Sequence, residues 1–298
     1  MSGSTGGALP DDERETLGLI AGEGEFPKLV LRGAKAAGMR VVVVGLPGCT
    51  ATWFLETADA FYRTGVARLG RWIRIFRREG VTRAIMAGKV RKAQMLALPR
   101  WRQWFAYLPD WASIKVWFFS GRDRRNDALL GSVADAMSRK GVELIDSTRY
   151  CGEAMVTAGR MTPRDLSPAQ QADAELGWRI AKEMGRLDVG QSVAVKDKDV
   201  IAVEAIEGTD AMIERAGSLC PSGGWTLVKV AKPKQDMRFD VPTIGPDTIE
   251  KLAASGGAVL VVEADKTLCL DRDRVIRLAR QHRIALVGRR STEDRQRV

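Results

Sequence analysis

The sequence predicts an α/β protein of two domains, and three observations support that prediction. The chain has 298 residues, which is enough for two domains of ordinary size that each bury a core. In the first half, short apolar runs alternate with helical patterns, as in parallel sheets covered by helices. The second half opens its sheet with a hairpin pattern, which is typical of a mixed α/β domain. We place a flexible leader at residues 1–15, the first domain at 16–148, a linker at 149–167 and the second domain at 168–298.

The composition is that of a soluble globular protein. Hydrophobic residues make up 45% of the chain and charged residues 28%, and no apolar run approaches the ~18–20 residues of a membrane span. The first fifteen residues have no basic start and no apolar run, so they do not resemble a secretory signal. The four cysteines are scattered without a CxxC pair, which argues against a disulfide framework and a thiolate metal site. We therefore expect a reducing, cytoplasmic location.

The histidine content and the net charge limit the chemistry. His282 is the only histidine, which excludes HExxH zinc sites and also excludes Ser-His-Asp triads unless His282 alone serves. A hydrolase with this sequence must work with carboxylates, Lys and Arg, backbone amides and a metal. The net charge of +10 favours an anionic partner, such as a phosphorylated metabolite or an acidic membrane surface. No zinc finger, RNP signature or KH-type GxxG is evident, so we expect no nucleic acid.

The first domain begins with a strand–turn–helix–strand pattern. We predict strands at 17–21 and 40–45 and a helix at 28–37, with Pro27 in the turn before it. This unit is typical of nucleotide-binding folds. However, Pro27 replaces the third glycine of a GxGxxG fingerprint and no acid follows the second strand, which argues against NAD. Gly22 and Gly24 either contact phosphate or sugar through the backbone or form a plain tight turn.

The rest of the first domain continues this alternation. We predict a helix at 66–79, a strand at 84–88, a helix from Asp127 to about residue 140 and a last strand at 142–145. Lys89 and Arg91 directly follow a buried strand. Since open α/β sheets bind ligands at the carboxyl ends of their strands, they are candidate anion contacts, with an ordinary solvated loop as the alternative.

An aromatic segment lies between these elements. Residues 94–119 hold four of the eight tryptophans, with Arg100, Arg102 and Lys115 among them. The segment is an amphipathic surface that touches lipid, the wall of a large apolar pocket, or packing between helices. The sequence leaves all three interpretations open.

The second domain shows clear start and stop signals. Ser167 and Pro168 begin a helix that ends near residue 185. A hairpin follows, with strands at 192–196 and 200–205. The remaining predicted elements are a helix at 210–216 capped by Thr209 or Asp210, a strand at 226–231, a helix at 246–254, strands at 258–263 and 267–270, a helix capped by Asp271 or Asp273, and a strand at 284–287.

Two turns of the second domain combine carboxylates with bases. The carboxylates are Glu207 and Asp210 in the first turn and Asp236 and Asp240 in the second, and the bases are Lys229, Lys232, Lys234 and Arg238. Acids that hold a hard cation beside bases that hold phosphate are what metal-assisted phosphoryl chemistry requires. A solvated hairpin with charges of both signs is the alternative.

Six blocks carry a resemblance to a known family. They are LIAGEGEFP at 19–27, MAGKV at 86–90, DVGQ at 188–191, VEAIEGTDAM at 203–212, KPKQD at 232–236 and DVPTIGP at 240–246. In type and order they resemble the UDP-2,3-diacylglucosamine pyrophosphatases of the LpxI type, which make lipid A precursors in Gram-negative bacteria. The resemblance spans about residues 17–290 and its second-half blocks are the specific ones.

The resemblance implies a fold and an activity. The enzyme would hydrolyse the diphosphate of UDP-2,3-diacylglucosamine to UMP and 2,3-diacylglucosamine 1-phosphate (lipid X), with water attacking the sugar-side phosphorus. It would need a divalent cation, most often Mg²⁺. A Rossmann-like first domain and a distinct second domain would close over the lipid, with the active site between them. It would be a homodimer that acts from the cytoplasm, transiently at the inner membrane.

This activity assigns roles to individual residues. We expect Mg²⁺ on carboxylates drawn from Asp210, Asp236 and Asp240, with Asp236 or Asp240 as general base. Lys229, Lys232 and Arg238 would stabilise the phosphates. The expected substrate-binding residues are Gly22, Gly24, Glu25, Lys89, Gln191, Glu207, Gly208, Thr209, Thr243 and Ile244. The aromatic segment 94–119 would line the acyl chains or face the membrane.

Two other functions fit the same pattern. The tryptophan-rich segment and the positive charge also suit a non-catalytic binding or transfer protein for an acylated glycan phosphate. A hydrolase for another nucleoside diphosphate sugar would use the same carboxylates and bases. A binding protein would release no UMP in the presence of Mg²⁺, and a different hydrolase would prefer unacylated UDP-glucosamine.

Overall fold

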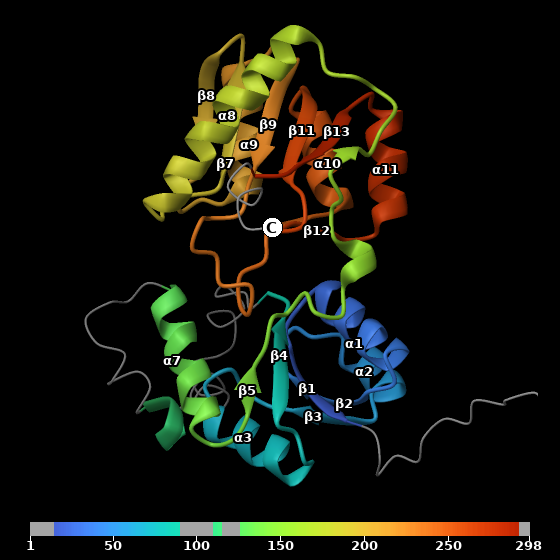
Figure 1. The fold of residues 1–298 in the computed structure, drawn as a ribbon, viewed down its shortest axis with the longest axis vertical. Coiled ribbons are helices and arrows are strands. Elements are labelled where there is room, and N and C mark those ends of the chain that lie inside the picture. The colour runs from blue at the N-terminus through green and yellow to red at the C-terminus, as the bar shows by residue number, and fades with distance from the viewer. Residues whose placement is uncertain (1–14, 90–109, 115–125, 292–298) are drawn as a thin grey trace, which may run out of the picture. The chain divides into compact units, whose positions relative to one another are not determined.

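The chain folds into two compact α/β units, which confirms the predicted fold class (Figure 1). The computed structural model describes residues 15–89, 110–114 and 126–291. The first unit comprises Met1–Cys151 together with Met237–Phe239, and the second comprises Gly152–Asp236 together with Asp240–Val298. In the described part of the chain, no helix is long and apolar enough to cross a membrane.

The first unit is built on a parallel sheet of five strands. Its strands are β1 (Thr16–Ala21), β2 (Arg40–Gly45), β3 (Ala60–Arg63), β4 (Arg83–Ala87) and β5 (Glu143–Leu144), in the order β3-β2-β1-β4-β5. β1 pairs in parallel with both β2 and β4. The strand order reverses at β1, so the crevice beyond its carboxyl end is where such sheets bind ligands.

The helices of the first unit include α1 (Phe26–Ala36), α2 (Ala51–Thr57), α3 (Leu69–Arg78) and α7 (Asn126–Ser138). The predicted helices at 28–37, 66–79 and 127–140 correspond to α1, α3 and α7. Phe76 of α3 and Met137 of α7 are fully buried in one core cluster, which explains the apolar periodicity of these two helices.

The sequence-based prediction missed α2 and β3. α2 has only seven residues, with Pro47 and Gly48 shortly before it, and β3 is a four-residue edge strand that is only partly buried. Neither element is long enough to show a clear hydrophobic period in the sequence. Their positions are set by packing in the folded unit. Phe54 of α2 and Phe61 of β3 stack with ring centroids 6.2 Å apart.

The second unit has a mixed sheet of six strands. These are β6 (Gly159–Arg160), β7 (Ser192–Lys196), β8 (Asp199–Val203), β9 (Trp225–Lys229), β11 (Gly257–Glu263) and β13 (Ala285–Arg289), in the order β6-β13-β11-β9-β7-β8. The three central strands β9, β11 and β13 are parallel, while β7, β8 and β6 add antiparallel pairs at the edges. A separate parallel pair joins β10 (Thr243–Ile244) and β12 (Leu268–Cys269).

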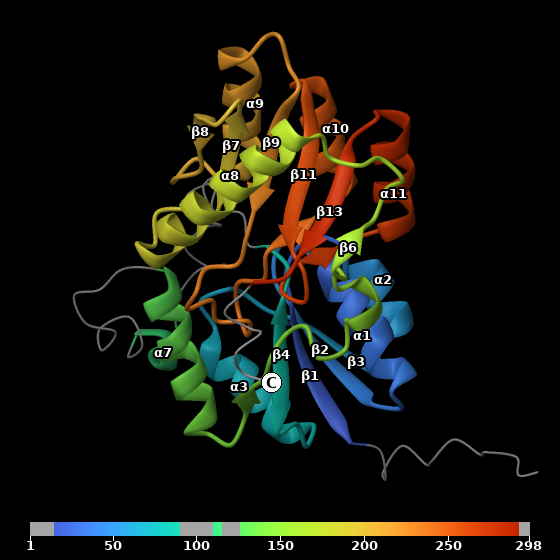
Figure 2. The same ribbon diagram turned by 45° about the horizontal axis from the view of Figure 1, so that its top comes forward.

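Helices cover both faces of this sheet (Figures 1 and 2). α8 (Pro168–Arg186) packs on one face, where Ala174, Trp178 and Ala181 meet Val259 and Val261 of β11. α9 (Thr209–Leu219), α10 (Pro246–Ala254) and α11 (Arg272–Gln281) contribute to the core on the other face, which includes Leu260 and Val262. The alternation along β11 is the two-residue period of a strand buried on both sides.

Helix caps were predicted with mixed success. Ser167 caps α8 in a capping box with Gln170, and Asp271 caps α11 through its side chain. The prediction that Thr209 or Asp210 caps α9 is wrong, because the N-cap is Gly208. Gly208 has φ +84°, a conformation that glycine adopts without the penalty of a Cβ.

The segment expected as a linker, 149–167, contains regular structure. It includes the short 3₁₀ helix η2 (Gly152–Ala154) and strand β6, whose Arg160 pairs with Val287 of β13. Gly288 permits this close approach, since a Cβ there would lie 2.1 Å from the Thr157 carbonyl oxygen.

Candidate active site

Three neighbouring strands of the second unit bring polar side chains into one row. Ser192 of β7 pairs with Lys229 at the end of β9. Glu204 directly follows β8, and its backbone N–H donates to the Ser192 carbonyl oxygen at 2.9 Å. Glu204, Ser192 and Lys229 are therefore adjacent across the sheet, and Glu204 and Lys229 are each only 8% exposed.

The hydroxyl of Thr209 links this row to helix α9. It donates to Glu204 Oε1 at 2.8 Å and accepts from Lys229 Nζ at 3.2 Å. Lys229 Nζ also donates to the Thr243 carbonyl oxygen at 3.2 Å. A buried carboxylate and a buried ammonium group thus share one hydroxyl, which fixes the lysine beside the first turn of α9.

The start of α9 adds further positive potential. Thr209 is its first residue, and the Gly208 N-cap has no side chain to occupy the first backbone N–H groups. The helix dipole places partial positive charge at this end. Together with the Lys229 ammonium group, these N–H groups suit a phosphate oxygen.

A braced loop carries the second pair of predicted carboxylates. Gln235 Oε1 accepts from the Lys232 N–H at 2.9 Å, and Gln235 Nε2 donates to the Asp240 carbonyl oxygen at 2.6 Å. The Asp240 N–H donates to the Asp236 carbonyl oxygen at 3.1 Å. Asp236 and Asp240 therefore lie one turn apart and are half-buried, while Lys232 Nζ forms an ion pair with Asp188 at 2.6 Å.

Glu207 and Asp210 have surface partners instead. Asp210 pairs with Lys251 of α10 at 2.7 Å, and Glu207 pairs with Arg215 of α9 at 2.6 Å. A hydrogen bond from its own backbone N–H, followed by the contact with Arg215, lowers the pKa of Glu207 against an opposing effect of desolvation. The hydrogen bond with Asp210 raises the pKa of Lys251. These are the ion pairs of an exposed helix surface.

The other predicted substrate-binding residues of the second unit differ in how far their side chains and backbone groups are buried. The side chain of Ile244 is 1% exposed and belongs to the core cluster, so only its backbone is open to a role in binding. Thr243 is half-buried, and its carbonyl oxygen accepts from Lys229. Gln191 precedes β7, and its Oε1 is buried without a hydrogen-bond partner in the described part of the chain.

In the first unit, the predicted glycine turn joins the ends of β1 and β4. The Gly22 N–H donates to the Ala87 carbonyl oxygen at 2.8 Å, and Glu23 and Lys89 exchange two backbone hydrogen bonds of 2.8 and 2.9 Å. A Cβ on Gly22 would lie 2.7 Å from the Lys89 carbonyl oxygen, so only glycine fits this approach. Gly22 and Lys89 thus meet at the point where the strand order reverses.

The remaining predicted residues of this turn are exposed. Gly24 has φ +105°, and Glu25 is the N-cap of α1, where its side chain pairs with Lys28 at 2.7 Å instead of capping the helix. Lys89 is exposed. Arg91 and most of the aromatic segment 94–119 lie outside the described residues, so their predicted roles stay predictions.

Arg238 belongs to the first unit although its sequence neighbours Asp236 and Asp240 belong to the second. The Met237 carbonyl oxygen accepts from the N–H of Ser147 at 3.1 Å and from its hydroxyl at 2.5 Å. Phe239 packs against the core of the first unit, and the Arg238 guanidinium group lies 4.9 Å from its ring centroid.

The donor set suits a cation that needs few protein ligands. Across residues 15–89, 110–114 and 126–291, no three His, Cys, Asp or Glu side chains form a group that would hold a metal by themselves. Mg²⁺ is usually bound by one or two carboxylates together with phosphate oxygens of the substrate. The half-buried turn of Asp236 and Asp240 fits that mode, whereas a structural zinc or calcium site would need more protein ligands.

Glu204 is the residue that the sequence-based reasoning missed. It lies inside the block 203–212, where Glu207 and Asp210 are part of a recognisable turn and Glu204 is not. The available signal was a single acid at the end of an apolar strand. Its burial and its hydrogen bond with Thr209 became visible only in the fold.

Comparisons with known proteins point to one family. The model of the LpxI N-terminal domain matches residues 16–154, and that of the LpxI C-terminal domain matches residues 157–287. The chain is 33% identical over 275 residues to UDP-2,3-diacylglucosamine pyrophosphatase LpxI of Caulobacter vibrioides, with 88% of this chain and 93% of that protein covered. A biotin carboxylase–β-γ-ATP complex from Campylobacter jejuni aligns with 70% of this chain and 43% of its own, at 14% identity. Its TM-score of 0.23 is too low to support an argument.

Proposed function

Because the chain belongs to the LpxI family, we propose that it hydrolyses the diphosphate of UDP-2,3-diacylglucosamine in lipid A biosynthesis. The products are UMP and 2,3-diacylglucosamine 1-phosphate (lipid X). The observation that carries this proposal is the 33% identity, over 88% of the chain, to a relative named as the pyrophosphatase for this substrate.

A divalent cation, Mg²⁺ or a substitute, is part of the proposal. Asp236 and Asp240 would hold it, since they lie on one half-buried turn. When bound, the cation neutralises charge on the diphosphate and orients it for in-line displacement. Asp210 is a weaker candidate as a ligand because it is already paired with Lys251 on an exposed surface.

The phosphate oxygens require positive groups that do not move during the reaction. Lys229 is buried and fixed by Thr209 and the Thr243 carbonyl oxygen, which supports a role in stabilising the charge that develops on phosphorus. Lys232 and Arg238 add charge from the neighbouring loop. Either Asp236 or Asp240 accepts the proton of the attacking water, which is directed at the sugar-side phosphorus.

The remaining polar groups would position the substrate. Thr209, held by Glu204, and the buried amide of Gln191 are suited to orient water or sugar hydroxyls. In the first unit, the turn of Gly22 and Gly24 and the neighbouring Glu25 and Lys89 lie at the carboxyl ends of β1 and β4. This position supports contact with the nucleotide or sugar through backbone N–H groups.

Location and assembly belong to the same proposal. A substrate with two acyl chains resides in a membrane, so the enzyme would act as a peripheral protein on the cytoplasmic face of the inner membrane, and as a homodimer. The net charge of +10 supports attraction to an anionic surface. Flotation with vesicles and light scattering after size exclusion test these two points separately.

The deciding experiment is an assay of the purified protein with UDP-2,3-diacylglucosamine. UMP and the lipid 1-phosphate should appear with Mg²⁺ and disappear with EDTA. Turnover that persists in EDTA would remove the metal from the proposal but leave the hydrolase. Tight binding without any UMP would support a lipid-binding protein instead, and faster turnover of unacylated UDP-glucosamine would indicate another substrate.

A further inference from the structure

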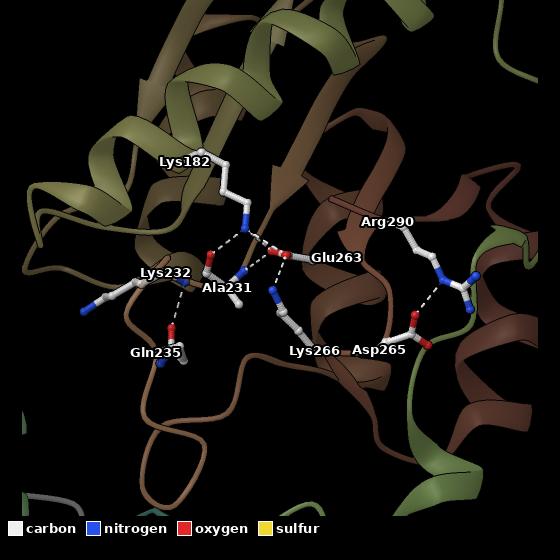
Figure 3. A network of polar contacts seen from close by, with 8 residues as sticks. All are labelled: Lys182, Ala231, Lys232, Gln235, Glu263, Asp265, Lys266 and Arg290. Carbon is white, nitrogen blue, oxygen red and sulfur yellow. Dashed lines mark hydrogen bonds and ion pairs between the residues drawn. The ribbon is translucent and has the colours of Figure 1, made fainter. Parts of the chain in front are cut away.

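An ion pair on the buried carboxylate of Glu263 lies beside the start of the loop that carries the proposed carboxylates (Figure 3). Glu263, the last residue of β11, is fully buried. Lys182 of α8 donates to both of its carboxylate oxygens, at 2.8 and 2.6 Å, and Lys266 Nζ lies 3.4 Å from Oε1. Lys182 Nζ also lies 5.7 Å from the centroid of the Trp178 ring, a favourable position for a cation.

The ion pair holds both backbone polar groups of Ala231. The Ala231 N–H donates to Glu263 Oε2 at 2.8 Å, and its carbonyl oxygen accepts from Lys182 Nζ at 3.1 Å. Ala231 is buried, and it immediately precedes Lys232 in the chain. The first peptide groups of the loop are therefore fixed by side chains from α8 and β11, which are far away in the sequence.

From this anchor the loop is braced to its end. Gln235 connects the N–H of Lys232 with the carbonyl oxygen of Asp240, and the Asp240 N–H closes the turn on Asp236. Helix α8 also lies directly against the loop, since a Cβ on Gly185 would be 3.1 Å from Lys232 Cα. A displacement of Ala231 would thus be transmitted to both carboxylates.

We propose that Lys182 and Glu263 are positioning residues that set the conformation of residues 231–240 and so the placement of Asp236 and Asp240. The importance of Asp236 and Asp240 rests on the proposed function, whereas the control of the loop does not. An ion pair with a buried carboxylate gains little stability over an apolar pair of equal volume, so we attribute these charges to the orientation of the loop.

Glutamine cannot replace Glu263 here. The carboxylate accepts from Lys182 on both oxygens and from Ala231 on one, and Lys266 forms an ion pair with the other oxygen. An amide offers one acceptor, and its NH₂ group would face either the Lys182 ammonium or the Ala231 N–H, both of which are donors. Glu263→Gln should therefore release the anchor while it preserves the side-chain volume.

The test combines amide hydrogen exchange with kinetics on the full-length protein. In Glu263→Gln and Lys182→Met, amides of residues 231–240 should exchange on the order of tenfold faster. The kcat should fall about 10–100-fold, as for residues that orient metal ligands, and the Mg²⁺ concentration for half-maximal rate should rise. The KM for the lipid substrate should change less than about threefold, because uniform binding is not affected. Lys182→Arg should restore most of the loss.

Asp265→Asn is the matched control. Asp265 lies two residues beyond Glu263 and pairs with the exposed Arg290 at 2.7 Å, without contact to the loop (Figure 3). This variant removes a carboxylate from the same turn and should exchange and react like the wild type.

Three outcomes would overturn the inference. Unchanged exchange of residues 231–240 in both variants would show that the pair does not hold the loop. Faster exchange across the whole sheet of the second unit, or failure of both variants to fold, would show a general structural role. Hydrogen exchange is measured without substrate, so it tests the control of the loop independently of the proposed function. If the wild-type protein showed no hydrolase activity, the proposed function would be refuted, but the exchange data would still show whether the ion pair holds the loop.

Discussion

Two carboxylate turns of the second unit look alike in sequence and differ in structure. Glu207 and Asp210 form ion pairs with Arg215 and Lys251 on an exposed helix surface. Asp236 and Asp240 lie on a half-buried loop that is braced by Gln235 and anchored at Ala231. Surface ion pairs contribute little energy and tolerate change, whereas hydrogen bonds hold the backbone that carries Asp236 and Asp240. The comparison shows that the surroundings of an acid, rather than the charge pattern near it, distinguish a candidate catalytic group.

The largest effect should come from the braced turn. Asp236→Asn and Asp240→Asn should each lower kcat on the order of 10²-fold or more, because either residue is a candidate for both metal ligand and general base. Steady-state hydrolysis of UDP-2,3-diacylglucosamine measures this effect, and circular dichroism confirms folding. Wild-type rates in both variants would place the chemistry elsewhere.

The second-largest decrease in kcat should come from substitution of Lys229. Lys229→Met keeps an unbranched apolar side chain but removes the ammonium group that Thr209 and Thr243 hold, so kcat should fall about 10²-fold. Lys251→Met, a lysine of the same unit on the exposed surface, is the control and should retain activity. An equal decrease in kcat in the two variants would mean that the net charge of the protein, rather than the position of the Lys229 ammonium group, determines the rate.

Asp210 should matter least for turnover. Asp210→Asn removes a partner of Lys251 whose own side chain is 58% exposed, so we expect less than about 1 kcal/mol of lost stability and a kcat within about twofold of the wild type. Denaturant unfolding and the same hydrolysis assay measure both quantities. A decrease in kcat as large as that of Asp240→Asn would indicate that Asp210 is a metal ligand.

The smallest expected effect is on the pH dependence of stability, through the carboxyl group of Glu207. Its own backbone N–H and Arg215 lower the pKa of this carboxyl in the folded state. A lowered folded pKa gives stabilisation that is present above the unfolded value, about 4.3, and is lost as the pH falls through the folded pKa. Glu207→Gln should therefore unfold with a shallower decrease of Tm on acidification below that value. Identical slopes for variant and wild type would show that the pairing contributes nothing.

The two-domain α/β class and most of the long elements were predictable because they depend on local pattern. The buried strands at 17–21, 40–45 and 258–263 are continuous apolar runs, and Ser167 with Pro168 marks a helix start that needs no tertiary contact. The short elements α2 and β3 were missed, and the cap of α9 was assigned one or two residues too late. In each case packing or a backbone angle decided the outcome, as Gly208 at φ +84° illustrates.

By itself, the sequence determined the order of the long strands and helices, the chemistry available without a histidine set, and the blocks that resemble one family. Only the tertiary structure decided which charged residues act together. In the folded protein, Glu204, Thr209 and Lys229 are joined by hydrogen bonds, whereas Asp210 and Glu207 form ion pairs on the surface. Glu263 accepts a hydrogen bond from Ala231, at the start of a loop that lies far from it in the sequence. The physical reason is that secondary structure follows local periodicity, whereas the contacts of a buried charge are set by strands and helices that meet only after folding.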